Sequence, residues 1–118
     1  MRTENQIQLT AFEKDQMPVI IEYINGHLHL PLTAEMIAGA FSISSYKLQA
    51  AFLILTGKSL VLFIKETRME AARNLLLTTN SPLKEIAGLC GYHHYNSFLR
   101  AFKNHFFITP NRFRRKKL

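Results

Sequence analysis

The sequence of 118 residues has one cysteine, no tryptophan and no long apolar run. Because Cys90 has no second cysteine to pair with, an internal disulfide is excluded and side-chain packing has to hold the fold together. No apolar run approaches the roughly 18 residues that a membrane-spanning helix needs. The first residues also lack the basic-then-apolar layout of a signal peptide. These absences predict a cytoplasmic protein without a membrane segment.

Patterns of catalytic residues are missing as well. The chain has no Ser-His-Asp set, no paired carboxylates and no glycine-rich phosphate loop, and it carries only eight acidic residues. The nearest approach to a metal site is the group Cys90, His93, His94 and His105, whose spacing matches no standard zinc pattern. We therefore expect neither an enzyme nor a protein that binds a metal ion or a cofactor.

Positive charge is concentrated in the last third of the chain. The net charge is +7. Residues 1–81 are balanced, and the surplus lies in residues 82–118, where Glu85 is the only acid. A basic region attracts a polyanion, and release of the polyanion's counterions favours binding. The alternative is a solvated tail, because Arg114, Arg115, Lys116 and Lys117 form a terminal run.

Apolar residues recur mostly with helical spacing and make up 47% of the chain, enough for a core. Thr33 and Ser44 mark helix starts, and Ser81-Pro82 and Thr109-Pro110 each combine a cap with a first-turn proline. Gly57 marks a helix end. The expected helices span residues 16–25, 34–40, 45–56, 59–78, 82–90, 95–106 and 111–115. Residues 1–14 are predicted to be a linker or a disordered lead-in.

Two segments are alike at an offset of 49 to 50 residues. Their shared landmarks are Ile37-Ala38-Gly39 with Leu48 and Phe52, and Ile86-Ala87-Gly88 with Phe98 and Phe102. Two helices joined by a short turn cross steeply and need a small residue at the crossing. An apolar pair pins the second helix and leaves its polar face free to enter a major groove. The alternative is two ordinary helical hairpins.

The expected helix at 59–78 separates the two repeats. At about 1.5 Å per residue it is roughly 30 Å long, close to the ~34 Å of one DNA turn. Such a spacer lets one monomer address two successive major-groove segments. We therefore divide the chain into a first helix-turn-helix subdomain (15–58), a connecting helix (59–79) and a second subdomain with a basic C-terminal tail (80–118).

The segment 68–115 resembles the signature of the AraC/XylS family of bacterial transcription regulators, and the resemblance extends over about residues 17–115. It is carried by Arg68, Ala72, Leu75, Leu76, Ile86, Ala87, Gly91, Tyr92, Phe98, Phe102, Lys103, Phe106, Pro110 and Arg114. It implies an all-α, homeodomain-like fold of seven helices, with two helix-turn-helix subdomains joined by a long central helix. The implied function is sequence-specific binding of double-stranded DNA in the regulation of transcription.

By the same resemblance, bases are contacted from the starts of the third and sixth helices. On this chain those positions are Tyr46, Lys47, Gln49 and Ala50, then Tyr95, Asn96 and Arg100. Family members often carry a separate sensing or dimerising domain ahead of this one, although small stand-alone members also exist. We expect a preceding domain of that kind and RNA polymerase as partners.

The first of these two reading helices departs from the family pattern, which commonly has Arg near Ala50 and basic residues where Leu53 and Ile54 stand. Its hydrogen-bonding groups are confined to Ser45, Tyr46, Lys47 and Gln49. Gln49 suits adenine, and Tyr46 and Ala50 suit a thymine methyl group. The second reading helix is richer, since Arg100 suits guanine and Asn96 adenine. We therefore expect affinity to be weighted toward the second subdomain.

Phosphate contacts are expected from basic and hydroxyl side chains and from amides at helix starts. The predicted residues are Ser45, Lys58, Ser59, Lys84, Lys103, Thr109, Asn111, Arg112 and Arg114.

Two apolar residues of the first reading helix are expected to point outward. With Leu48, Phe52 and Leu55 on the core stripe, Leu53 and Ile54 form an exposed pair suited to a protein partner. The alternative is a wider core stripe. A further function class also fits the composition: a helical interaction module whose basic tail binds anionic surfaces without sequence preference.

Backbone strain is expected at two places. Phe107 stands just past a helix end where the family often has glycine, and Ser42 stands where the second repeat has Gly91. A positive φ at either residue costs about 1 kcal/mol.

Overall fold

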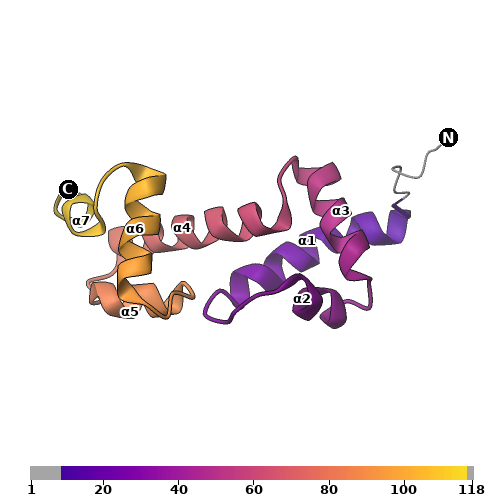
Figure 1. Cartoon of the computed structure of the whole chain (residues 1–118), viewed down its shortest axis with the longest axis horizontal. Coiled ribbons are helices and arrows are strands. Elements are labelled where there is room, and N and C mark those ends of the chain that lie inside the picture. Colours follow the sequence, from indigo (N-terminus) through magenta and orange to yellow (C-terminus); the bar gives the residue numbers. More distant parts are fainter. Residues whose placement is uncertain (1–8, 117–118) are drawn as a thin grey trace. The chain divides into compact units, whose positions relative to one another are not determined.

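The structure, a computed structural model, describes residues 9–116. Over that range the chain forms seven α-helices and no strand (Figure 1), so the predicted all-α class and helix number are confirmed. The helices are α1 (Ala11–Gly26), α2 (Ala34–Ala40), α3 (Ser45–Thr56), α4 (Leu60–Thr78), α5 (Leu83–Leu89), α6 (Tyr95–Phe106) and α7 (Pro110–Lys116). No single helix of this range is long and apolar enough to cross a membrane; α2 and α3 pass that test only as a pair, with a bend of 97° between them.

Two compact units make up the fold. The first comprises α1, α2, α3 and α4 as far as Ile64, and the second comprises the rest of α4 from Lys65 with α5, α6 and α7. The segment Leu28–Pro31 belongs to the second unit, although the sequence placed it in the first subdomain. The reason is a long-range hydrogen bond, in which Arg68 donates to the Leu30 carbonyl (2.9 Å).

The first helix begins earlier than predicted. Thr10 and Glu13 form a capping box: the Glu13 N–H donates to Thr10 Oγ1 (3.0 Å), and the Thr10 N–H donates to Glu13 Oε1 (3.1 Å). Satisfying these two amides fixes the start at Ala11. Residues 11–14 are therefore helical, contrary to the predicted lead-in, while residues 1–8 of that lead-in lie outside the described range.

Side-chain caps set the next two starts as predicted. The Thr33 hydroxyl accepts from the Met36 N–H (3.1 Å), and the Ser44 hydroxyl accepts from the Lys47 N–H (3.0 Å). The turn between α2 and α3 is short, and the 97° bend between the helices is typical of a helix-turn-helix unit. The core of this unit consists of buried residues Met17, Ile20, Ile24, Ile37, Ala38, Leu48, Ala51, Phe52, Leu60 and Ile64.

The second unit has its own apolar core. It consists of Met69, Ala72, Leu76, Ile86, Ala87, Cys90, Phe98 and Phe102. The predicted start of α5 is wrong by one position, because Pro82 rather than Ser81 is the N-cap, and it makes no side-chain capping bond. Thr109 does cap α7, accepting from the Arg112 N–H (3.3 Å), with Pro110 as the first helical residue.

Candidate nucleic-acid interface

The two helix-turn-helix turns share one backbone hydrogen bond at equivalent positions. After α2, the Ile43 N–H donates to the Ala38 carbonyl (3.1 Å); after α5, the Tyr92 N–H donates to the Ala87 carbonyl (2.9 Å). The residue before each donor has a left-handed backbone, with φ of 55° at Ser42 and 90° at Gly91. This bond across a left-handed residue is the Schellman motif. The internal repeat is therefore a repeated turn geometry, and the strain expected at Ser42 is present.

Gly91 is required at its turn for a second reason. A Cβ atom there would overlap the Arg68 guanidinium and the Leu28 carbonyl oxygen. The same guanidinium donates to the carbonyls of Cys90 (2.9 Å) and Leu30 (2.9 Å), and burial lowers its pKa. Arg68 thus has a structural role, tying the end of α5 to the segment Leu28–Pro31 within the second unit.

Each reading helix is pinned by the predicted apolar pair. Leu48 and Phe52 of α3, and Phe98 and Phe102 of α6, are fully buried. This register aligns the two helices at an offset of 50 residues, so Ala50 corresponds to Arg100 and Leu53 to Lys103. The faces opposite the pairs are exposed and differ sharply in chemistry.

The exposed face of α6 is polar and basic. Asn96, Arg100 and Lys103 are exposed, and the Arg100 guanidinium makes a long contact of 3.5 Å with Ser97 Oγ. Tyr95 is half-buried and stacks on Phe98, and the Lys84 ammonium lies 5.7 Å from the centre of its ring. This face therefore presents an amide and a guanidinium, the groups that pair with adenine and guanine.

The exposed face of α3 is mainly apolar. Tyr46 is 67% exposed and Leu53 59% exposed. They line an open groove of about 390 Å³ together with Gln49, Ala50, Ser59 just before α4 and Leu60 at its start. Leu53 and Ile54 point outward as predicted, but Leu55 is exposed too, because Ala51 takes the remaining core position.

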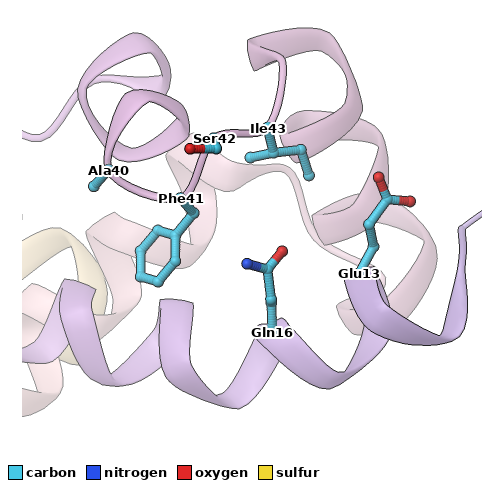
Figure 2. A pocket seen from close by; sticks show the side chains of 6 residues that line it. All are labelled: Glu13, Gln16, Ala40, Phe41, Ser42 and Ile43. Carbon is cyan, nitrogen blue, oxygen red and sulfur yellow. The ribbon is translucent and has the colours of Figure 1, made fainter.

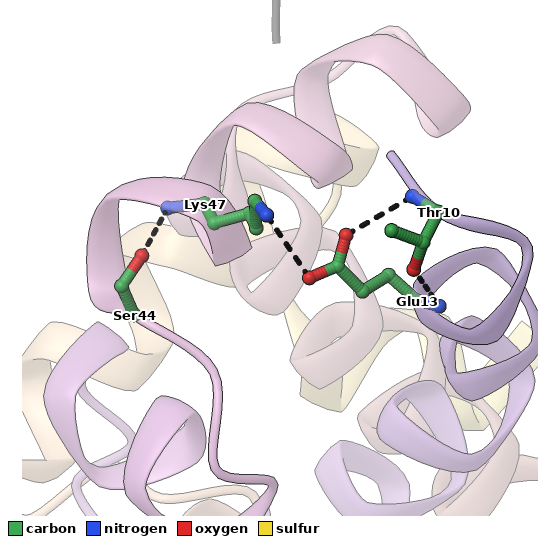
Figure 3. A network of polar contacts seen from close by, with 4 residues as sticks. All are labelled: Thr10, Glu13, Ser44 and Lys47. Carbon is green, nitrogen blue, oxygen red and sulfur yellow. Dashed lines mark hydrogen bonds and ion pairs between the residues drawn. The ribbon is translucent and has the colours of Figure 1, made fainter. Parts of the chain in front are cut away.

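The one cation of α3 is already paired. Lys47 Nζ lies 3.1 Å from Glu13 Oε2, the carboxylate oxygen that the α1 capping box does not use (Figure 3). Hydrogen bonding to the Thr10 amide, and next to Lys47, lowers the pKa of Glu13. The carboxylate is therefore ionised at neutral pH and holds the ammonium that the sequence assigned to a base contact.

A second cavity lies beside this pair. It has a volume of about 350 Å³, and Figure 2 shows Glu13 and Gln16 rising from α1 toward Phe41, Ser42 and Ile43 of the α2–α3 turn. Its polar side chains are one carboxylate, one amide and one hydroxyl. They do not form a paired-carboxylate or nucleophile–base arrangement.

The predicted phosphate contacts fall into two groups. Lys58, Ser59, Lys84, Lys103, Asn111 and Arg112 are exposed, and Ser45 and Thr109 are half-buried. The hydroxyls of Ser59 and Thr109 accept from helix-start amides, and each keeps a proton to donate to a phosphate oxygen. Ser45 Oγ accepts from Gln49 Nε2 (3.1 Å), which positions the amide of a predicted base contact.

Arg114 does not fit its predicted role. Its guanidinium donates to the carbonyls of Ser81 (2.7 Å) and Thr79 (3.2 Å), so it points into the second unit and fastens α7 to the α4–α5 connection. The neighbouring Arg115 and Lys116 are exposed; Lys117 lies outside the described residues. The basic run is thus part of a helix through Lys116, and Arg114 serves structure.

Metal-ligating residues do not converge within residues 9–116, where no three His, Cys, Asp or Glu side chains come close enough to share an ion. Cys90 is buried in the core, and that burial raises the pKa of its thiol to about 11. The thiolate needed for nucleophilic chemistry is therefore scarce at neutral pH.

The chain matches a family model described as a helix-turn-helix domain over residues 37–116. It is 32% identical over 97 residues to the regulatory protein SoxS of Salmonella typhimurium, covering 82% of this chain and 91% of SoxS. The chain belongs to the AraC/XylS family of helix-turn-helix transcription regulators. The resemblance seen in the sequence is thereby confirmed.

Two other AraC/XylS-type relatives extend this result. The C-terminal domain of AraT, a response regulator from Geobacillus stearothermophilus, is similar with a TM-score of 0.81 and 30% identity, covering 95% of this chain and 90% of that domain. The xylose operon regulatory protein of Escherichia coli is 29% identical over 100 residues, which are 82% of this chain but only 26% of that protein. The same domain thus occurs there within a longer chain.

Sequence reasoning missed one residue of this AraC/XylS domain that bears on the reading helices. Glu13 was assigned to the lead-in, yet its carboxylate reaches Lys47. The available signal was the Thr-x-x-Glu spacing of Thr10 and Glu13, which marks a helix start. That spacing reveals the cap, whereas the contact with α3 follows only from the packing of the two helices.

Proposed function

We propose that the chain binds double-stranded DNA sequence-specifically in the major groove and regulates bacterial transcription. The observation that carries this proposal is the exposed face of α6, where Asn96, Arg100 and Lys103 lie opposite the buried pair of Phe98 and Phe102. A helix anchored on one side, with an amide and a guanidinium on the other, suits the base edges of a major groove.

Bases and phosphates are contacted by different residues. Arg100 pairs with guanine and Asn96 with adenine, while Tyr95 of the same helix contacts a neighbouring base. Gln49, on α3 of the first unit, contacts adenine in the segment that this unit binds. Phosphates are bound by Lys84, Lys103, Arg112 and Asn111 in the second unit, and by Lys58, Ser59 and Ser45 in the first, with Thr109 at the start of α7. Arg115, exposed in α7, takes the place of Arg114 in this set.

Both units contribute to one bipartite site. Their link, α4, is a continuous helix of 19 residues, roughly 28 Å long at 1.5 Å per residue. A monomer then needs no partner copy to contact two successive major-groove segments. A footprint of one chain on its site is expected to cover both segments.

Protein partners are expected beside the DNA. Ile54 is 54% exposed and does not line the groove that includes Leu53, so it is the better candidate for contact with RNA polymerase or with a preceding sensor domain. An Ile54→Lys variant that binds DNA normally but activates transcription less supports this contact; unchanged activation removes it. Neither catalysis nor a cofactor forms part of the proposed function.

Selection of bound duplexes from a random pool tests the proposal, followed by competition with unselected DNA at fixed salt. A selected duplex should resist a large excess of random DNA, since specific sites are typically about 10³-fold tighter or more. A chain that only binds anionic surfaces instead shows one weak affinity that falls steeply with salt. That second result would overturn the proposal.

A further inference from the structure

The two reading helices place opposite chemistry at equivalent positions. Where α6 has Arg100 and Lys103, α3 has Ala50 and Leu53. The side chains of α3 at spacing i, i+3, i+4 and i+7, from Tyr46 to Leu53, line the groove of about 390 Å³. Because this face is mainly apolar, it suits apolar groups of a partner as well as the hydrogen-bonding edges of bases.

The polar groups of this face are held in place. Lys47 is paired with Glu13 at 3.1 Å, so its charge is neutralised beside the groove. The Gln49 amide donates one N–H to Ser45 Oγ at 3.1 Å, and this bond fixes the orientation of the amide. The amide's carbonyl oxygen and its second N–H are not used in that bond. These are the two groups with which glutamine pairs to adenine N6 and N7.

One base pair offers both kinds of partner in the major groove. In an A·T pair, adenine supplies the edge that glutamine recognises, and thymine supplies the C5-methyl group, the only apolar group on a base edge there. We propose that α3 recognises an A·T-rich segment mainly through thymine methyl groups, which enter the groove formed by Tyr46, Ala50 and Leu53. This inference rests on the proposed function and specifies what the first unit binds.

Replacing thymine with uracil tests the proposal, because uracil lacks only the C5-methyl group and keeps every hydrogen-bonding atom. The full chain is titrated with a selected duplex in which each thymine of the footprint is replaced in turn. A buried methyl group corresponds to about a fourfold change in affinity. We expect losses of about that size at two or more thymines of one segment.

Variants of the chain test whether the affinity losses caused by uracil arise from contacts with α3. In Leu53→Ala the uracil effect should shrink at the same thymines, whereas in Arg100→Ala it should persist. Val61→Ala is the matched control, since Val61 is 75% exposed on the neighbouring helix but does not line the groove; it should leave every uracil effect unchanged.

Two outcomes separate this inference from the proposed function. Specific binding that is insensitive to uracil at every position, or uracil effects that Leu53→Ala leaves intact, overturns the methyl-recognition proposal alone. Failure to obtain any selected duplex overturns the proposed function itself. Circular dichroism of Leu53→Ala verifies that the variant is folded, which is expected because the side chain is exposed.

Discussion

Glu13 and Lys47 form an ion pair of 3.1 Å that joins the start of α1 to the start of α3. The Lys47 side chain stays 35% exposed, but the pair neutralises the one positive charge of α3, which a phosphate would otherwise attract. The lowered pKa of Glu13 extends the pH range over which the carboxylate is ionised and the pair persists to values below those of an ordinary glutamate. As the pH falls through that lowered pKa, the pair is lost.

Releasing this lysine should change how the protein binds random DNA. Glu13→Gln keeps a residue suited to the capping box but frees Lys47, so non-specific affinity should rise. The slope of log K against log salt should steepen by about 0.9, the value for one additional phosphate contact. Salt titrations of binding measure this slope. Glu22→Gln, with the same charge change at an exposed position of α1, should steepen the slope less; equal slopes for the two variants contradict the role of the pair.

Gly91 should be intolerant of any side chain. Gly91→Ala introduces a Cβ atom at φ 90°, against Arg68 and the Leu28 carbonyl, so the free energy of unfolding should fall by about 2 kcal/mol or more. Denaturant unfolding measures the change. Gly88→Ala is the control, since a Cβ atom in that helical position meets nothing within 4 Å, and its stability should be unchanged or higher. Similar losses in the two variants would argue against the overlap.

Phe107 has a strained backbone conformation, and its side chain buries little surface that could offset the strain. Its φ is 62° and its side chain is 87% exposed, so Phe107→Gly should raise the free energy of unfolding by about 0.5–1 kcal/mol. At the equivalent helix end, Gly57 has φ 77°, and Gly57→Phe should lower stability by a similar amount. Thermal or denaturant unfolding midpoints of the two variants measure these opposite changes in stability. A destabilised Phe107→Gly variant contradicts the strain argument.

Substitution of Arg114 should lower stability, whereas substitution of the neighbouring Arg115 should weaken DNA binding. Arg114→Ala removes two hydrogen bonds from a charged donor to partly buried carbonyl groups, and we expect the free energy of unfolding to fall by about 2 kcal/mol. Arg115→Ala, at the exposed neighbour, should leave stability within about 0.5 kcal/mol and weaken DNA binding. Unfolding curves and binding titrations of both variants are compared. The assignment is wrong if Arg114→Ala unfolds normally and loses only DNA affinity.

Local rules made most of the fold predictable from sequence. Caps at Thr33, Ser44 and Thr109 fixed their helix starts, and the apolar spacing of Phe98 and Phe102 identified the buried side of α6. These signals act within a few residues, where sequence and structure are directly linked. The positive φ at Phe107 was likewise expected from its place after a helix end.

Long-range contacts were less predictable. Arg114 was assigned to phosphate from its charge, but its hydrogen bonds reach carbonyls 33 and 35 residues earlier in the chain. Lys47 was assigned to a base, but Glu13 holds it, 34 positions away. The sequence around a basic residue is the same whether its side chain faces solvent or bonds within the protein. Only the packed structure shows which of the two holds.

The difference between the two reading helices tests the account most directly. Dissociation constants of the original chain, Arg100→Ala and Gln49→Ala are measured at one salt concentration, for the selected duplex and for a scrambled one. The original chain should strongly prefer the selected duplex. Arg100→Ala should lose about 1–3 kcal/mol of that preference, and Gln49→Ala should lose less. Equal losses in the two variants would contradict the weighting toward the second unit, and no preference in the original chain would contradict sequence-specific binding altogether.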